Sequence, residues 1–193
     1  MAIQLIVGLA NPGKEYATTR HNAGAWWLQA VCAQYNVTLQ TQTKLQASLG
    51  NAELNGIKFK CAVTTTYMNH SGQTVAKIAN YFAVPTDSIL IVHDELDFAP
   101  GTIRFKTGGG HGGHNGLRDI IPQLNAQNFH RLRIGIGHPG DRDQVADYVL
   151  SAPSKADKQQ IDNAIQNSLT MLPAILAGEW QTVMNQLHQT SSN

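Results

Sequence analysis

Side chains capable of acid–base chemistry are concentrated in a few short segments of the sequence. His21 lies just ahead of a segment with helical periodicity, and Asp94 closely follows a short apolar run. The amino end of a helix disfavours an imidazolium, so a histidine there is kept neutral and can accept a proton. A carboxylate within hydrogen-bond reach raises the basicity of the ring and fixes its tautomer. These two residues therefore suggest a histidine general base supported by an aspartate.

Three asparagines, Asn11, Asn69 and Asn115, lie close to the ends of expected strands and helices. Their amide groups can donate hydrogen bonds to a developing oxyanion or align a substrate carbonyl. A base with such donors and no covalent nucleophile suits the hydrolysis of an ester, whose leaving group is better than that of an amide. A serine hydrolase is disfavoured because the sequence has no GxSxG pattern.

A metal-dependent hydrolase is an alternative for the same segments. Histidine and aspartate side chains at short spacing can bind zinc or a binuclear metal site. The candidate ligands are His93, Asp94, Asp97, His111 and His114. The simpler interpretation is that these side chains bond to the backbone of their own loops. The HExxH pattern is absent and no cysteine lies nearby in the sequence, so the metal site is the weaker hypothesis.

Residues 108–116, hereafter the glycine loop, contain six glycines in nine positions. Backbone with so few side chains can approach a ligand closely or act as a flap. The loop contains GxGxxG, but no acidic residue follows about twenty positions later, where a dinucleotide site places one. Arg131 and Arg133 lie there instead, and no Walker lysine is present. Dinucleotide and triphosphate sites are therefore disfavoured.

The formal charge of +1 hides a local excess of positive charge. Residues 101–140 contain five bases and one acid, a local net of +4, which leaves −3 for the remaining residues. The bases are Arg104, Lys106, Arg118, Arg131 and Arg133. A basic patch on a mildly acidic body suits a polyanion such as a nucleic acid, although a charge cluster is as often a solvated face.

The elements that position these residues can be read from the apolar patterns. Expected strands cover residues 3–9, 47–54, 57–65, 89–92, 103–106 and 131–137. Expected helices cover residues 22–35, 71–83 and 117–124, the last interrupted near Pro122, and a helical C-terminal third begins with a capping box at Ser154 and Asp157. Asn55-Gly56 predicts a type I′ hairpin turn.

This pattern predicts one α/β domain over residues 1–193, with a twisted, mixed, mostly parallel sheet flanked by helices. Parallel strands deliver their carboxyl ends to one edge of a sheet. That edge could gather Asn11, His21, Asn69 and Asp94 into one site. Cys32 and Cys61 are expected to be buried thiols, and the short apolar run near the start is no leader or anchor. We therefore expect a cytoplasmic protein without a membrane segment.

Five ordered motifs resemble those of the bacterial-type peptidyl-tRNA hydrolases. The match is collinear from about Ile3 to Gly140, whereas the helical tail is compatible but unspecific. The motifs are GLANPG (8–13) continuing through Tyr16 to RHNAG (20–24), TYMN (66–69), HDELD (93–97), the glycine loop, and RLRIGIG (131–137). One departure is His70, where the family pattern would place an apolar residue, usually leucine.

The resemblance implies a monomeric, metal- and cofactor-independent esterase that cleaves the bond between a peptide's C-terminal carboxyl and the 3′-terminal ribose of tRNA. Such an enzyme recycles tRNA from abandoned translation and needs no membrane or obligate protein partner. By the same resemblance, His21 is the general base and Asp94 its partner. The peptide and the water would be positioned by Asn11, Asn69 and Asn115. The site would also be lined by Tyr16, Met68 and His114. The phosphates of the acceptor stem would be held by Arg104, Lys106 and Arg133.

A catalytically silent RNA-binding module is the second hypothesis, because it could use the same basic patch and glycine loop. Phosphate binding requires neither His21 nor Asp94, however, nor the three asparagines. The presence of all five residues favours the esterase.

Overall fold

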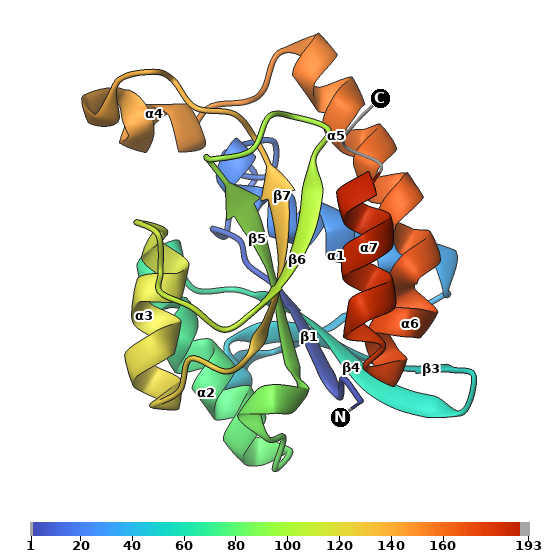
Figure 1. The fold of residues 1–193 in the computed structure, drawn as a ribbon. Coiled ribbons are helices and arrows are strands. Elements are labelled where there is room, and N and C mark those ends of the chain that lie inside the picture. Colours follow the sequence, from blue (N-terminus) through green and yellow to red (C-terminus); the bar gives the residue numbers. More distant parts are fainter. Residues whose placement is uncertain (1, 190–193) are drawn as a thin grey trace.

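Seven strands form one mixed sheet in the order β2-β3-β4-β1-β5-β7-β6 (Figure 1). The computed structural model describes residues 2–189. The strands are β1 Leu5–Gly8, β2 Gln40–Gln42, β3 Ala47–Leu54, β4 Ile57–Thr64, β5 Ile89–Glu95, β6 Ile103–Thr107 and β7 His130–Gly135. β1 pairs in parallel with β4 and β5, and β5 with β7, while the three outer pairs are antiparallel. Five of the seven strands run in one direction, with β3 and β6 opposed, so the expected mixed, mostly parallel sheet is confirmed.

Helices cover both faces of the sheet (Figure 1). They are α1 Ala23–Gln34, α2 Ser71–Tyr81, α3 Asn115–Leu124, α4 Val145–Val149, α5 Lys155–Ser168, α6 Leu172–Ala177 and α7 Trp180–Gln189. One buried cluster joins the sheet to α1 and the C-terminal helices, and a second joins its other face to α2 and α3. The helical C-terminal third is therefore confirmed. No helix within residues 2–189 is both long and apolar enough to cross a membrane.

The central strands are apolar on both faces because each face is covered by helices. In β5, Ile89 and Ile91 join the cluster under α2 and α3, whereas Leu90 and Val92 join the cluster under α1. Side chains alternate along a strand, so Asp94 follows Leu90 and Val92 onto the α1 side. The apolar run thus sets the direction in which the carboxylate points.

Two glycines allow α1 to begin directly against the sheet. A Cβ on Gly24 would lie 2.1 Å from the carbonyl oxygen of Val92, and one on Gly8 would lie 2.6 Å from the carbonyl oxygen of Gly24. Any larger residue would push the start of α1 away from β1 and β5. Since His21 lies three residues before Gly24, this close approach brings it to the end of β5.

Several boundaries differ from the sequence-based expectations by one or two residues, α4 was not expected, and three further differences stand out. β5 continues to Glu95, so Asp94 lies within the strand and not after it. The expected interruption of α3 is wrong, because the helix runs through Pro122 and ends at Leu124. β2 was not expected, since its three residues are all exposed and polar and have no apolar alternation. The hairpin turn is confirmed: Asn55 and Gly56 both adopt positive φ, 52° and 79°.

Candidate active site

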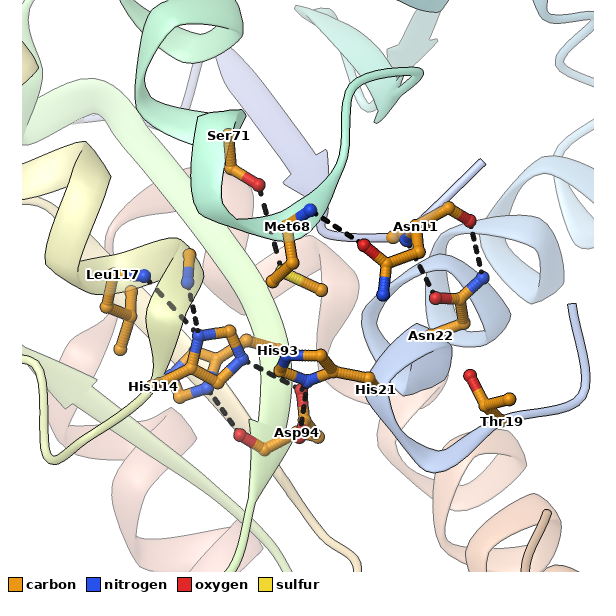
Figure 2. A network of polar contacts seen from close by, with 12 residues as sticks. Asn11, Thr19, His21, Asn22, Met68, Ser71, His93, Asp94, His114 and Leu117 are labelled. Carbon is orange, nitrogen blue, oxygen red and sulfur yellow. Dashed lines mark hydrogen bonds and ion pairs between the residues drawn. The ribbon is translucent and has the colours of Figure 1, made fainter. Parts of the chain in front are cut away.

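His21 and Asp94 form a buried hydrogen-bonded pair at the carboxyl end of β5 (Figure 2). His21 Nδ1 lies 2.9 Å from Asp94 Oδ1 and 3.0 Å from Oδ2, and the two residues are 6% and 3% exposed. An ionised carboxylate only accepts hydrogen bonds, so His21 Nδ1 carries the proton and donates it. His21 Nε2 is left with a lone pair, which is the arrangement that a general base requires.

His114 makes a second hydrogen bond to the same carboxylate. Its Nε2 donates to Asp94 Oδ1 at 2.8 Å, while its Nδ1 accepts from the backbone N–H groups of Gly116 at 3.1 Å and Leu117 at 3.4 Å. His114 is therefore the N-cap of α3, and both of its ring nitrogens are engaged in hydrogen bonds. It orients Asp94 and has no nitrogen left to act as a base.

Burial and hydrogen bonding shift the pKa values of His21 and Asp94 in opposite directions. Burial lowers the pKa of His21, but the charge and hydrogen bond of Asp94 outweigh it, so the pKa is raised above its ordinary value. Burial would raise the pKa of Asp94, but His21 and His114 hold it well below its ordinary range. The carboxylate is thus ionised, and its effect on the pKa of His21 exceeds that of burial.

His93 lies beside the pair and also lines the glycine-loop lobe. Its Nδ1 donates to the backbone oxygen of Asp94 at 2.6 Å, and its ring contacts that of His114 edge-on at 4.9 Å. Burial lowers the pKa of His93 to about 3, so the ring is neutral.

The structure groups the potential metal ligands differently from the sequence-based alternative. Among residues 2–189, the group of three that could hold a metal is His21, Asp94 and His114, whose ligand atoms lie within 4.8 Å of one another. Both histidines already donate to the carboxylate, so this geometry satisfies three polar groups without an ion. Asp97 and His111 do not belong to the group.

The asparagines are oriented by neighbouring donors. Asn11 Oδ1 accepts from the backbone N–H of Met68 at 2.7 Å, and Asn115 Oδ1 accepts from Arg118 Nη1 at 2.9 Å. The Nδ2 group of each is therefore directed away from these contacts and can donate to a ligand. Asn22 holds the backbone of Asn11 through both of its amide atoms, at 2.8 and 3.0 Å. Sequence reasoning missed this role for Asn22, although its position next to His21 was a usable signal.

Two cavities meet at His21. The asparagine lobe, of about 310 Å³, is lined by Asn11, Tyr16, Tyr67, Met68 and Asn69, among others. The glycine-loop lobe, of about 430 Å³, is lined by the end of β5 and by the glycine loop. Both lobes share His21, Asn115, Ala146 and Val149.

Each of the eight catalytic and substrate-binding candidates thus lines one lobe or both. His70, the departure from the family pattern, is exposed, lies near Gln73 and lines neither lobe.

Arg20 anchors the helix that contributes to both lobes. Its Nη1 lies 2.7 Å from Ser151 Oγ and 3.0 Å from the carbonyl oxygen of Ala152, and its guanidinium lies 3.9 Å from the ring centroid of Tyr148 in α4. The residue next to His21 therefore holds α4 in place. Periodicity gave no signal for this role, because the partners lie about 130 residues away.

The basic residues expected to bind phosphate form a ladder on β6 and β7. Arg104 pairs in register with Arg133, and Lys106 with Arg131, so the four side chains share one face of the sheet. Arg133 is also in register with His93, the neighbour of Asp94. The ladder therefore starts beside His93 and runs back along β7 and β6, on the face of the sheet opposite to the Asp94 side chain. Arg118 is not part of it, because it lies on α3 and bonds to Asn115.

Comparison with known proteins identifies the family of the chain. Residues 5–193 match the family model of peptidyl-tRNA hydrolase. A peptidyl-tRNA hydrolase of Legionella pneumophila (strain Paris) is 52% identical over 188 residues, covering 97% of this chain and 100% of that protein. One from Pseudomonas savastanoi pv. phaseolicola is 51% identical, covering 97% of both. The crystal structure of the Acinetobacter baumannii enzyme matches with a TM-score of 0.93 at 46% identity, covering 96% of this chain and 94% of that one. The chain belongs to the peptidyl-tRNA hydrolase family and is a hydrolase that acts on the ester bond of peptidyl-tRNA.

Proposed function

We propose that His21 is the general base of a metal-independent hydrolysis, with Asp94 as its partner. The observation that carries the proposal is the buried 2.9 Å hydrogen bond from His21 Nδ1 to Asp94 at the junction of the two lobes. His21 Nε2 takes a proton from water as the water oxygen attacks the ester carbonyl carbon. Collapse of the tetrahedral intermediate expels the ribose 3′ oxygen, which takes the proton from the imidazolium. The products are a peptide carboxylic acid and a tRNA with a free 3′ hydroxyl.

The asparagine lobe takes the peptide, and the glycine-loop lobe takes the 3′-terminal nucleotide. Asn11 and Asn115 each have a directed Nδ2 group that can donate to a carbonyl oxygen as it gains negative charge. Asn69 is exposed at the peptide lobe, and Tyr16 and Met68 line the same lobe. His114 acts on Asp94 from the other side.

Arg104, Lys106 and Arg133 hold phosphates of the acceptor stem. Arg104 and Arg133 both lie over the ring of Phe98, at 5.2 and 4.7 Å, which fixes two cations side by side. Because these groups address the backbone, base identity contributes little to binding. We propose that the chain works as a monomer in the cytoplasm, as its membership of the family implies.

Removal of metal separates the three candidate functions. We expect the enzyme to release N-blocked amino acid from tRNA at the same rate with and without a chelator such as EDTA. Loss of activity that zinc restores would support the metal-dependent hydrolase. Binding of tRNA without release of the amino acid would support the RNA-binding module.

Selectivity for N-acylated substrates follows from the asparagine amides. A peptidyl ester presents a neutral amide next to the reacting carbonyl, whereas a free aminoacyl ester presents an ammonium that cannot accept a hydrogen bond. Asn69 and Asn115 are exposed in the free enzyme and become covered when the substrate binds. The ammonium then leaves their amide groups unpaired, at a cost on the order of several kcal/mol when more than one bond is lost. We expect kcat/KM to favour N-acetyl-aminoacyl-tRNA strongly over the same aminoacyl-tRNA.

Variants of the asparagines test this explanation of selectivity. Asn69→Ala and Asn115→Ala are each expected to reduce the preference by slowing the N-acylated substrate more than the free one. Equal kcat/KM values for the two substrates in the wild-type enzyme would contradict the explanation and indicate a general tRNA-ester hydrolase.

A further inference from the structure

Arg131 differs from the other members of the basic ladder. Its side chain is buried, with 2% of the residue exposed, whereas Arg104 and Arg133 are half-buried and Lys106 is exposed. Its Nη1 donates to the carbonyl oxygen of Gly110 at 2.6 Å, and its Nη2 donates to that of Gly109. Burial, with a smaller contribution from Arg133, lowers its pKa to about 10, so it remains a cation at neutral pH.

The glycine loop is fixed at both ends and open in the middle. At its start, the N–H of Gly108 donates to the carbonyl oxygen of Phe129 at 3.0 Å, and the next two carbonyls accept from Arg131. At its end, His114 caps α3. A Cβ on Gly110, Gly112 or Gly113 would meet no atom within 4 Å. Arg131 is therefore the last contact before the open stretch.

We propose that Arg131 is a positioning residue for the hydrolysis and does not bind phosphate. Its planar fork ties two successive carbonyls to β7 and so sets the path by which the loop reaches His114 and Asn115. Without these two hydrogen bonds, the loop has no support from Gly109 onward. His114 and Asn115 are then no longer held in position against Asp94 and the substrate. This inference rests on the proposed roles of His114 and Asn115.

A side chain that binds phosphate and a side chain that positions the loop have different measurable effects when they are replaced. Each phosphate contact that is lost lowers the slope of log K against log salt by about 0.7 to 0.9. A misplacement of about 1 Å at a catalytic site can cost on the order of 10²-fold in rate. Arg133→Gln should therefore lower the salt slope of tRNA binding and raise the Kd. Arg131→Met should leave the slope and Kd unchanged and lower kcat roughly 10- to 100-fold.

The rate is best measured on the N-acetyl-aminoacyl ester of adenosine, which has no acceptor stem. Arg131→Met should lower kcat on this ester as much as on the tRNA substrate, and Arg131→Lys should recover part of the loss, since it can donate to one carbonyl. Lys58→Met, which removes an exposed cation on β4, should match the wild-type enzyme. A lower salt slope in Arg131→Met with an unchanged rate on the small ester would overturn the proposal.

Gly109→Ala tests the same contact if Arg131→Met does not fold. Gly109 has a φ of +96°, which alanine adopts only with strain, so the substitution disturbs the backbone at the first carbonyl acceptor without changing Arg131. A Cβ there would also displace the flexible end of Lys106, which lies 2.6 Å away and has no phosphate to bind on the small ester. This variant should also lower kcat on the small ester. The double variant with Gly109→Ala and Arg131→Met should be no slower than the slower of the two single variants. Full activity of Gly109→Ala would overturn the proposal. If the wild-type enzyme and His21→Asn cleaved the ester equally, the proposed function itself would be wrong.

Discussion

His21→Asn is expected to slow hydrolysis of peptidyl-tRNA by roughly 10²- to 10⁴-fold or more, because the reaction loses its positioned base. Asparagine fits the space and can still hydrogen-bond to Asp94, but its amide nitrogen has no lone pair able to take a proton from water. The basic ladder lies on β6 and β7 and is unaffected. Binding of tRNA should therefore persist. A single-turnover rate and a tRNA Kd, measured on the same preparation, test both parts.

The matched control is His70→Asn. His70 is exposed and lines neither lobe, so its replacement should leave the rate near that of the wild-type enzyme. His114 continues to donate to Asp94 in the His21 variant, so the buried carboxylate keeps a partner and the fold is retained. Near-normal turnover in His21→Asn would refute the assignment of the base.

Asp94→Asn should retain the fold, reduce the maximal rate and shift the pH profile. An amide cannot stabilise the imidazolium and does not fix the Nδ1–H tautomer, for which a loss on the order of 10²- to 10⁴-fold is reasonable. In the wild-type enzyme, burial lowers the pKa of His21 and Asp94 raises it more. Removing the charge leaves burial unopposed, so the pKa should fall.

The sign of the pH shift follows from the role of His21. A general base acts in its neutral form, so kcat/KM rises as the pH increases through the pKa of His21. In Asp94→Asn this rise should therefore occur at lower pH, to a lower plateau. Asp162→Asn, which changes a half-buried carboxylate paired with Lys158 on α5, should leave the profile unchanged. An unchanged rate and pH profile in Asp94→Asn would show that the pair is not catalytic.

The sheet could be predicted because its central strands are buried on both faces. Continuous apolar runs such as residues 89–92 are typical of covered parallel strands, and Asn55-Gly56 fixes the β3–β4 register. β2 gave no signal, because an exposed edge strand of three polar residues looks like a loop. The end of β5 was misjudged for a related reason: Asp94 is polar but is buried by its hydrogen bonds to His21 and His114.

The membership of the site was more predictable than its internal geometry. Residue types drew attention to His21, Asp94 and the asparagines, but the tautomer of His114 depends on its capping of α3. The five bases of residues 101–140 look equivalent in the sequence. Their separation into a surface ladder, a partner of Asn115 and a buried anchor of the glycine loop depends on which backbone lies opposite each side chain. Spacing along the chain contains no such information.

The most direct test of the account is the protonation of His21 itself. Imidazole ¹⁵N chemical shifts, followed by NMR over a pH titration, report both the tautomer and the pKa of a histidine. For the wild-type enzyme we expect a neutral ring protonated at Nδ1, with a pKa above its ordinary value that falls in Asp94→Asn. A neutral ring protonated at Nε2, or a pKa that does not respond to Asp94→Asn, would contradict the claim that Asp94 prepares His21 to take a proton from water.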